Sequence, residues 1–488
     1  MLYLSTRGDG HKVSSAEAIR RGLAPDGGLY LPEALPSFSL DEIVKLSALS
    51  YPERAAFVLS RFLTDYTYEE LLEYANKAYA SFQPDVITLT DSMHILELYH
   101  GPTCAFKDFA LQMLPYLLTG ALKKTGESRT AVILTATSGD TGKAALEGFA
   151  DVPGTRIAVF YPEGGTSRIQ QLQMTTQEGS NVNVIAVKGN FDDAQTGVKQ
   201  LFSDPELAKQ LSDQGYFFSS ANSINWGRLA PQIAYYFSAY ADLVAAGRIN
   251  GGELVNIVVP TGNFGNILAS YLAYQCGLPV KTFLCASNRN NVLTDFIRTG
   301  QYNANRPFYL TASPSMDILV SSNLERLLYL LSEADSDAVA GNMRELKEKG
   351  FYGISDAVLG HLQEKFSAGC ADDKMTEETI LRTFKDHRYL IDTHTAVAVK
   401  VYEDYARETG DQTPSIIAST ASPFKFPKSI LEALEQEVPA DGFDQLRALE
   451  QVSGLTSPAS LSSLENKPER FTKAVAPEDM KEAILAWL

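Results

Sequence analysis

The apolar positions of this chain fall into short continuous runs separated by helical patterns. Six such runs occupy residues 131–135, 156–161, 183–187, 254–259, 280–284 and 415–418. A strand buried on both faces of a parallel sheet needs an uninterrupted run of this kind. Segments with helical spacing of apolar residues lie between the runs, for example 142–150 and 266–276. This alternation predicts βαβ units, and therefore an α/β fold of open, mostly parallel sheets flanked by helices.

Three other segments depart from this alternation. Residues 24–32 form a turn signal followed by an extended piece, and 40–49 and 68–82 have amphipathic helical patterns, which predicts an N-terminal capping domain over 1–95. Residues 96–430 are then expected to form the central region, with two α/β subdomains, and any ligand-binding or catalytic site is expected there. Within it, about 290–386 is rich in helix formers and charge and predicts a helical insertion, after which a strand is expected at 389–392. Residues 431–488 are expected to form an acidic helical tail.

Charge and cysteine content narrow the possible functions. Lysine plus arginine number 42 and aspartate plus glutamate 59, for a net charge of −17, which disfavours nucleic acid and anionic membranes as partners. An anionic substrate would need a local group of cations. The four cysteines form no CxxC pair, so neither a zinc site nor a disulfide framework is expected. The opening residues do not resemble a signal peptide and no apolar stretch reaches about 18 residues, so we expect a cytoplasmic protein.

A polar loop follows the first of these strands. Residues 135–142 read TATSGDTG and open a helix, where hydroxyl and backbone N–H groups can bind a carboxylate or a phosphate. A nucleotide-binding P-loop is excluded, because its first glycine would fall on Thr137 and the residue after Lys143 is Ala144. The alternative is a simple turn with a helix cap.

A second loop, residues 260–266, reads PTGNFGN between a strand and a helix. Glycine there allows close approach of an anion to backbone N–H groups, or a positive φ. Phe264 occupies the second glycine position of a dinucleotide fingerprint, so a single phosphate is the better expectation than a dinucleotide. An ordinary strand-to-helix turn is the alternative.

Two weaker signals complete the set. Hydroxyl groups in residues 418–422 could bond a ring nitrogen, although a polar turn is the better explanation for this loop taken alone. Lys107 is flanked by Phe106 and Phe109, an apolar setting that frees an amine as a nucleophile; the alternative is a solvated lysine paired with Asp108. A lysine, a monophosphate loop, a ring-nitrogen hydroxyl and a carboxylate loop together are the parts that pyridoxal phosphate requires to act on an amino acid.

The motifs also resemble those of a known family. GPTCAFKD at 101–108, TSGDTG at 137–142 and GNFGN at 262–266 are similar to threonine synthases of the long bacterial and fungal type, as are residues 3–8, 22–32 and 222–232. The similarity runs from Met1 to about Phe426. It implies the type II fold of pyridoxal-phosphate enzymes, in the arrangement of the tryptophan synthase β subunit.

The resemblance also implies roles for individual residues. Lys107 would be the Schiff-base lysine, and Thr420 would face the pyridine nitrogen. The cofactor phosphate would lie on Gly262, Asn263, Phe264, Gly265 and Asn266. The substrate carboxylate would be bound by Thr137, Ser138, Asp140 and Thr141. Because Asp140 is itself an anion, where short-type relatives have asparagine, it is left open whether it faces the substrate ammonium or the cofactor hydroxyl. Candidates for the substrate phosphate are Arg228, Lys188 and Arg168, assisted by Ser223, Asn225 and Asn190.

The activity that the resemblance implies is conversion of O-phospho-L-homoserine and water to L-threonine and phosphate, by γ-elimination and β-hydration on pyridoxal phosphate. Lys107 would be the general base. Two alternatives remain at this point: a related phospho-lyase that releases 2-oxobutyrate, and a non-catalytic relative that binds metabolites. No metal is expected, and the protein is expected to be a monomer or a homodimer.

Overall fold

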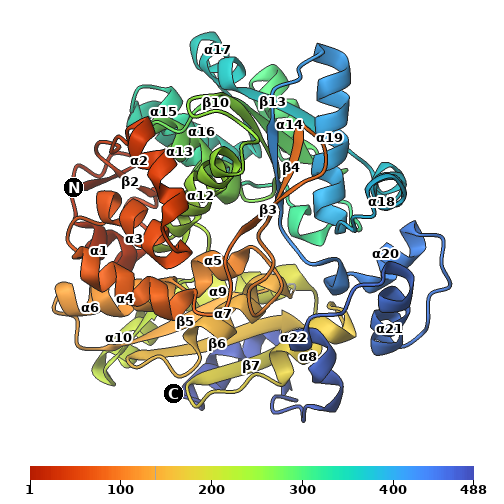
Figure 1. Cartoon of the computed structure of the whole chain (residues 1–488). Helices are drawn as coiled ribbons and strands as arrows, with labels where there is room; N and C mark the ends of the chain where they lie inside the picture. The colour runs from red at the N-terminus through yellow and green to blue at the C-terminus, as the bar shows by residue number, and fades with distance from the viewer. Residues whose placement is uncertain (138) are drawn as a thin grey trace.

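The computed structural model describes residues 1–137 and 139–488, and two large sheets organise them (Figure 1). The first sheet is wholly parallel, with strand order β15-β7-β6-β5-β8. Its strands are β5 (Thr130–Ala136), β6 (Thr155–Pro162), β7 (Val182–Val187), β8 (Tyr216–Ser219) and β15 (Ala474–Val475). The associated helices are α7 (Asp140–Phe149), α8 (Arg168–Thr175), α9 (Phe191–Ser203) and α10 (Pro205–Asp213). The predicted strands at 131–135, 156–161 and 183–187 are confirmed.

The second sheet has the order β13-β10-β9-β14-β4-β3, and only β3 runs antiparallel to its neighbour. Its strands are β3 (Asp85–Thr88), β4 (Met93–Glu97), β9 (Val255–Pro260), β10 (Val280–Ser287), β13 (Phe366–Cys370) and β14 (Ser415–Ser419). The helices around it include α12 (Pro231–Ala245), α13 (Gly265–Gln275), α14 (Val292–Thr299) and α19 (Thr393–Thr409). In each sheet several parallel strands end at the same edge, and ligands of open α/β folds bind beyond these carboxyl ends.

The N-terminal part packs against this frame as a helical layer. It consists of β1 (Tyr3–Ser5), α1 (Ser15–Arg21), β2 (Tyr30–Pro32), α2 (Leu40–Lys45), η1 (Leu46–Ala48), α3 (Tyr51–Phe62) and α4 (Tyr68–Ala78). Ser39 with Glu42 and Thr67 with Glu70 form capping boxes that fix the starts of α2 and α4. Because β3 and β4 already belong to the second sheet, the central frame begins before the expected boundary at residue 95.

The region expected to be a helical insertion is largely helical, but it also contains β13, which pairs with β10 in the main sheet. One expectation for the later part of the chain is wrong. Residues 389–392 form no strand; Asp392 instead caps α19 by accepting bonds from the backbone N–H groups of His394 and Thr395. The rest of the region is largely helical. It contains β11 (Gln301–Asn303), η2 (Pro314–Met316), α15 (Leu324–Leu331), α16 (Ser336–Lys349), β12 (Phe351–Gly353), α17 (Asp356–Lys365) and α18 (Asp373–His387).

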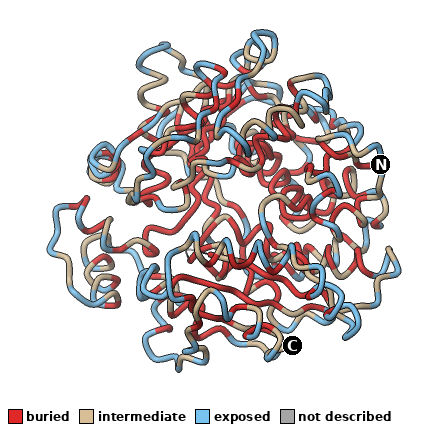
Figure 2. The backbone as a smooth tube through the Cα atoms, turned by 180° about the vertical axis from the view of Figure 1, so that it is seen from behind, coloured by how far each residue is buried: buried red, intermediate tan, exposed pale blue. Residues whose placement is uncertain are grey.

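The C-terminal part is mostly helical but also completes the first sheet through β15. Its other elements are η3 (Pro423–Lys425), α20 (Pro427–Ala433), α21 (Gly442–Ser453), α22 (Ala459–Ser462), η4 (Ser463–Asn466), η5 (Pro477–Asp479) and α23 (Met480–Leu485). Figure 2 shows that the buried residues gather in the interior of the molecule, whereas the exposed residues lie mainly along its outer loops. Among the helices that the structure describes, none is long and apolar enough to cross a bilayer.

Candidate active site

Lys107 is the first residue of the short helix α5 (Lys107–Leu111), which continues into α6 (Leu114–Lys124). Its side chain is buried, and its Nζ donates to Asp140 Oδ2 at 3.3 Å and to Ser315 Oγ at 3.1 Å. The Nζ also lies 5.2 Å from the centroid of the Phe106 ring. Burial lowers the pKa of the Lys107 amine, and this effect outweighs the opposing attraction of Asp140. The setting is that of a nucleophilic amine rather than a solvated surface lysine.

Asp140 opens α7 and lies at the centre of the polar cluster around Lys107. Its Oδ2 faces Lys107 and Ser315, while its Oδ1 lies 2.7 Å from Lys425 Nζ and accepts from Gln170 Nε2 at 3.2 Å. Burial alone would raise the pKa of this carboxyl, but the charges of Lys425 and Lys107 hold it well below its usual range. Asp140 is therefore a fully paired carboxylate and an acceptor at both oxygens.

Two residues of this cluster have no signal in the local sequence. Ser315, in η2, donates its hydroxyl to Asp140 Oδ2 at 3.1 Å, and its backbone N–H donates to His394 Nε2 at 3.1 Å. His394 in turn bonds Asp392 through Nδ1 at 2.8 Å. Lys425, in η3, is buried completely at its side chain and also donates to the carbonyl of Thr103. Each comes from a segment remote in the chain, so only the fold brings it to Lys107.

The predicted phosphate loop has the geometry of an anion cradle. The backbone N–H groups of residues 262–266 have no acceptor among the residues that the structure describes. They lie at the start of α13, where the helix dipole favours an anion. The residue with positive φ is Phe264, at 61°; Gly262 and Gly265 do not need one. A positive φ as the reason for these glycines is therefore wrong, and close approach of an anion stays a prediction.

Neighbouring side chains hold this loop in place. The carbonyl of Asn263 accepts from the backbone N–H and the side-chain amide of Asn323, at 3.1 and 3.0 Å. The Oδ1 of Asn266 accepts from the hydroxyls of Tyr235 and Tyr236, both at 2.6 Å, so the side chain of Asn266 anchors the helix. Within the described residues, its Nδ2 is buried without a partner. The donor set fits the phosphate of pyridoxal phosphate.

Thr420 and the first loop lie on segments that reach the same cluster. The carbonyl of Thr420 accepts from the backbone N–H of Phe106, next to Lys107, at 2.9 Å. Thr137 Oγ1 accepts from the N–H groups of Gly139 and Gly142 at 3.0 and 2.9 Å, so this oxygen stabilises its own loop. Thr141 is half-buried in α7. Ser138 lies outside the described residues.

Among the three cations predicted to bind the substrate phosphate, Arg228 in α11 (Trp226–Leu229) is the buried one. Its side chain is buried and donates from Nη1 to the carbonyl of Ala221 at 2.7 Å. No carboxylate pairs with it among the residues that the structure covers, and burial lowers its pKa to about 10. Its positive charge also acts to lower the pKa of Lys107. Ser223 lies beside the phosphate loop, because a Cβ added to Gly265 would be 4.0 Å from the Ser223 Cβ.

The structure does not bring the remaining candidates into this cluster. Asn225 is buried and caps α11, with its amide also bonded to the carbonyl of Ile19. Asn190 is exposed and caps α9. Lys188 is exposed after the end of β7, and Arg168 is half-exposed and paired with Glu469 at 2.8 Å. Because the side-chain oxygens of both asparagines are occupied by helix caps, the polar assistance expected from them is not supported.

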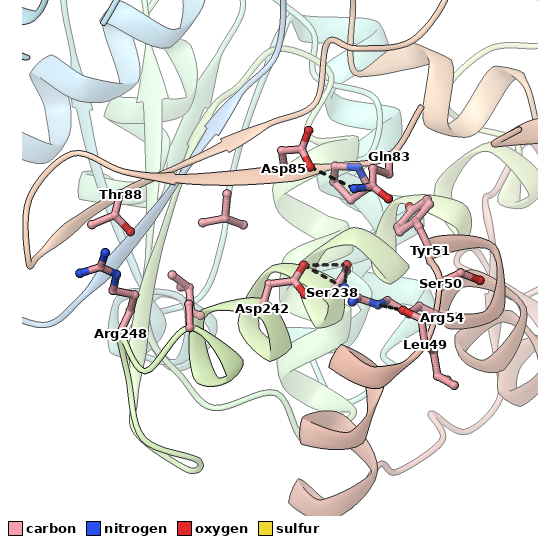
Figure 3. A pocket seen from close by; sticks show the side chains of 14 residues that line it. Leu49, Ser50, Tyr51, Arg54, Gln83, Asp85, Thr88, Ser238, Asp242 and Arg248 are labelled. Atoms are coloured by element: carbon pink, nitrogen blue, oxygen red, sulfur yellow. Dashed lines mark hydrogen bonds and ion pairs between the residues drawn. The ribbon is translucent and has the colours of Figure 1, made fainter. Parts of the chain in front are cut away.

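A separate surface cavity lies between α3, β3 and α12 (Figure 3). Its buried cation, Arg54, donates to Asp242 at 2.8 Å, to Ser238 at 2.7 Å and to the carbonyls of Leu49 and Ser47. The guanidinium is therefore occupied in joining the N-terminal layer to α12. None of the residues that line this cavity contacts Lys107 through a hydrogen bond, so the chemistry lies elsewhere.

Known proteins resemble the chain over its whole length. Family descriptions match in order: "Threonine synthase N terminus" over residues 2–79, "Pyridoxal-phosphate dependent enzyme" over 94–349 and "Threonine synthase, C-terminal" over 395–484. Threonine synthase of Pseudomonas aeruginosa is 38% identical, with 98% of this chain and 96% of that protein aligned. Threonine synthase-like 1 of Pongo abelii is 39% identical over 93% of this chain, which spans only 63% of that longer protein.

Solved structures agree with this assignment. The crystal structure of threonine synthase from Brucella melitensis with bound pyridoxal phosphate superposes with a TM-score of 0.89. It shares 37% identity and covers 100% of this chain and 99% of its own. The yeast threonine synthase structure also reaches a TM-score of 0.89, at 32% identity. The chain belongs to the threonine synthase family of pyridoxal-phosphate-dependent lyases, and has their type II fold.

Proposed function

We propose that the protein is a threonine synthase, which converts O-phospho-L-homoserine and water to L-threonine and phosphate. The observation that carries this proposal is the pair formed by Lys107 and Arg228. Both side chains are buried, Arg228 has no carboxylate partner among the described residues, and its positive charge acts to lower the pKa of Lys107. A substrate with an amino group at one end and a phosphate at the other matches these two groups.

The other site residues take the roles that the resemblance to threonine synthases implies. Pyridoxal phosphate supplies an electron sink for the carbanions that such a reaction needs. The backbone of residues 262–266 holds its phosphate, and Thr420 faces its ring nitrogen. Thr137, Ser138 and Thr141 bind the substrate carboxylate, while Arg228 and Ser223 bind the phosphate that leaves. Lys188 and Arg168 are retained only as outer cations that attract the substrate.

Lys107 is the proton carrier in this proposal. Its Nζ is neutral at a lower pH than that of an ordinary lysine because burial lowers its pKa. The neutral amine takes the α-proton and then a β-proton of the substrate, and returns protons after water adds at the β-carbon. The buried surroundings of Lys107 exclude bulk water from Nζ during these transfers.

The test is a product analysis with O-phospho-L-homoserine as substrate. We expect one L-threonine and one phosphate for each substrate consumed, and no turnover by Lys107→Ala, which lacks the amine. Release of phosphate with 2-oxobutyrate in place of threonine would instead identify a phospho-lyase. A protein that holds the substrate without releasing phosphate would be a binding relative.

We also infer that the protein acts in the cytoplasm on a small molecule, without nucleic acid or membrane partners, as a monomer or homodimer. Its net charge of −17 opposes binding to polyanions. All four cysteines are free thiols, three of them buried, which suits a reducing compartment.

A further inference from the structure

The site contains one more cation than a Schiff-base lysine and a substrate clamp require. Lys425 lies on the opposite side of Asp140 from Lys107: it bonds Oδ1, whereas Lys107 bonds Oδ2. Its side chain is completely buried, and the carbonyl of Thr103 accepts a second bond from its Nζ at 3.0 Å. A buried lysine is costly unless it is paired, so a specific role is to be expected for it.

The two carboxylate oxygens of Asp140 have different partners. Oδ1 is anchored by Lys425 and Gln170, at 2.7 and 3.2 Å. Oδ2 is directed at Lys107 and Ser315, at 3.3 and 3.1 Å. Ser315 is itself held by His394, which is bonded to Asp392. Because Oδ1 is held by Lys425 and Gln170, the direction of Oδ2 is fixed as well.

The charges around Lys107 can be counted from the same contacts. Asp140 contributes one negative charge, and Lys425 and Arg228 each contribute a positive one. His394 also acts to lower the pKa of Asp140, and Lys425 acts to lower the pKa of the buried groups Asp108 and Cys104. Burial raises the pKa of Asp108 to about 6 and that of the Cys104 thiol to about 11, so Asp140 is the strongest anion of the cluster.

Without Lys425, Lys107 would be the nearest counter-ion of a buried carboxylate. An opposite charge within hydrogen-bond distance stabilises the ammonium form of a lysine, and an ammonium cannot act as a nucleophile or a base. We propose that Lys425 is a positioning residue that serves as the permanent counter-ion of Asp140. Asp140 then remains an oriented carboxylate while Lys107 works as a neutral amine.

This role explains why the carboxylate of Asp140 does not hold the neighbouring Lys107 in its ammonium form. With Lys425 in place, the Asp140–Lys425 pair is neutral as a unit, so Lys107 can lose its proton without leaving a net negative charge buried. Oδ2 of Asp140 remains available as an acceptor for an N–H or O–H group of the ligand bound at Lys107. The inference rests on the proposed function only in taking that ligand to be pyridoxal phosphate with an amino acid.

The test measures how fast the full-length protein, stripped of cofactor, captures pyridoxal phosphate on Lys107 as a function of pH, with borohydride trapping. For Lys425→Met we expect the midpoint of this profile to rise by about one pH unit or more, because Asp140 then stabilises the ammonium of Lys107. For Asp140→Asn the midpoint should fall, because Lys425 is left uncompensated. In the double variant, where both charges are gone, it should return to within about half a unit of the wild type.

The matched control is Lys428→Met. Lys428 is three residues further along, is 66% exposed and lies 3.8 Å from Glu432, so its loss should leave the midpoint unchanged. Single substitutions that shift the midpoint in the same direction, or no shift for Lys425→Met, would overturn the proposal. So would a change of similar size in the control.

The denaturant concentration at which each variant unfolds tests the same proposal independently. A single substitution leaves one buried charge without its partner, whereas the double variant leaves none, so the double variant should unfold at a higher denaturant concentration than Lys425→Met. A double variant no more stable than Lys425→Met would mean that Lys425 acts through Thr103 and not through Asp140. Correct midpoint shifts in a protein that forms no threonine would refute the proposed function and leave this inference intact.

Discussion

Arg228 illustrates how a single residue can reveal what a site is built to bind. Burying a guanidinium costs free energy, and a single carbonyl bond repays little of it. The cost makes sense if a bound anion completes the pairing. Arg228→Ala should therefore lower kcat/KM for O-phospho-L-homoserine by roughly 10- to 150-fold, which corresponds to one charge-assisted contact of about 1.5–3 kcal/mol.

The same variant should retain its affinity for an unphosphorylated amino acid, measured from the change in the cofactor's absorbance on binding. Arg248→Ala, at an exposed arginine, is the control and should behave as wild type in both assays. Equal losses for the phosphorylated and unphosphorylated ligands would show that Arg228 only supports the fold. Attention would then move to Lys188 and Arg168.

The limits of prediction from sequence are also clearest for single residues. Lys107 is predictable because its flanking phenylalanines and motif are local. Ser315 lies 208 residues from Lys107, in a segment that reads as a helical insertion, and Lys425 sits in a short turn with no flanking pattern of its own. Asn190 and Asn225 have the residue type of ligands, but helix capping uses the same amide oxygen. Only the three-dimensional contacts separate these cases.

At the scale of elements, the start of α13 makes a prediction that separates binding from folding. A Cβ added to Gly265 would meet its nearest neighbour, the Asn323 amide nitrogen, at 3.5 Å, an ordinary contact. Gly265→Ala should thus leave the unfolding midpoint of the cofactor-free protein unchanged or slightly raised, since alanine favours a helix. Cofactor retention, measured by equilibrium dialysis, should fall about tenfold or more, because the methyl group competes with the phosphate for the N–H groups.

Gly262→Ala provides the contrast to this variant. There the added Cβ would lie 2.6 Å from the carbonyl oxygen of Ser315, so backbone must move. We expect destabilisation by about 1–3 kcal/mol in addition to weaker cofactor binding. If Gly265→Ala retains the cofactor as tightly as wild type, the phosphate does not lie on α13.

Helices and strands also differ in how clearly the sequence predicts them. The six strands with largely apolar runs were predictable, because burial on both faces favours such runs. β13 was not, since its residues FSAGC contain few large apolar side chains and it lies at the edge of the sheet. Residues 389–392 have the apolar pattern of a strand but do not form one. Leu390 and Ile391 are buried as strand residues would be, but Asp392 caps α19, so the helix begins directly after it.

At the scale of the molecule, one buried arginine joins the N-terminal layer to the loop of residues 262–266, the proposed phosphate loop. Arg326, in α15, is completely buried and donates to the carbonyls of Tyr30 and Ile224 at 3.0 and 2.6 Å. It also donates to Asn323 Oδ1 at 2.6 Å, and Asn323 holds the carbonyl of Asn263. Burial lowers the pKa of Arg326 to about 9, with Glu325 opposing the shift.

The N-terminal layer is therefore part of the active site's support rather than a detachable cap. Arg326→Met removes three buried bonds while keeping an apolar stem of similar length, and should lower the free energy of unfolding by about 2–4 kcal/mol. Because Asn323 loses its anchor, cofactor dissociation should also accelerate, by roughly tenfold if the loop loses one good hydrogen bond. Denaturant unfolding and dialysis measure the two effects, with the exposed Arg344→Met as the control. A variant that is destabilised but holds the cofactor as tightly as wild type would show that the N-terminal layer and the phosphate loop are not coupled through Arg326.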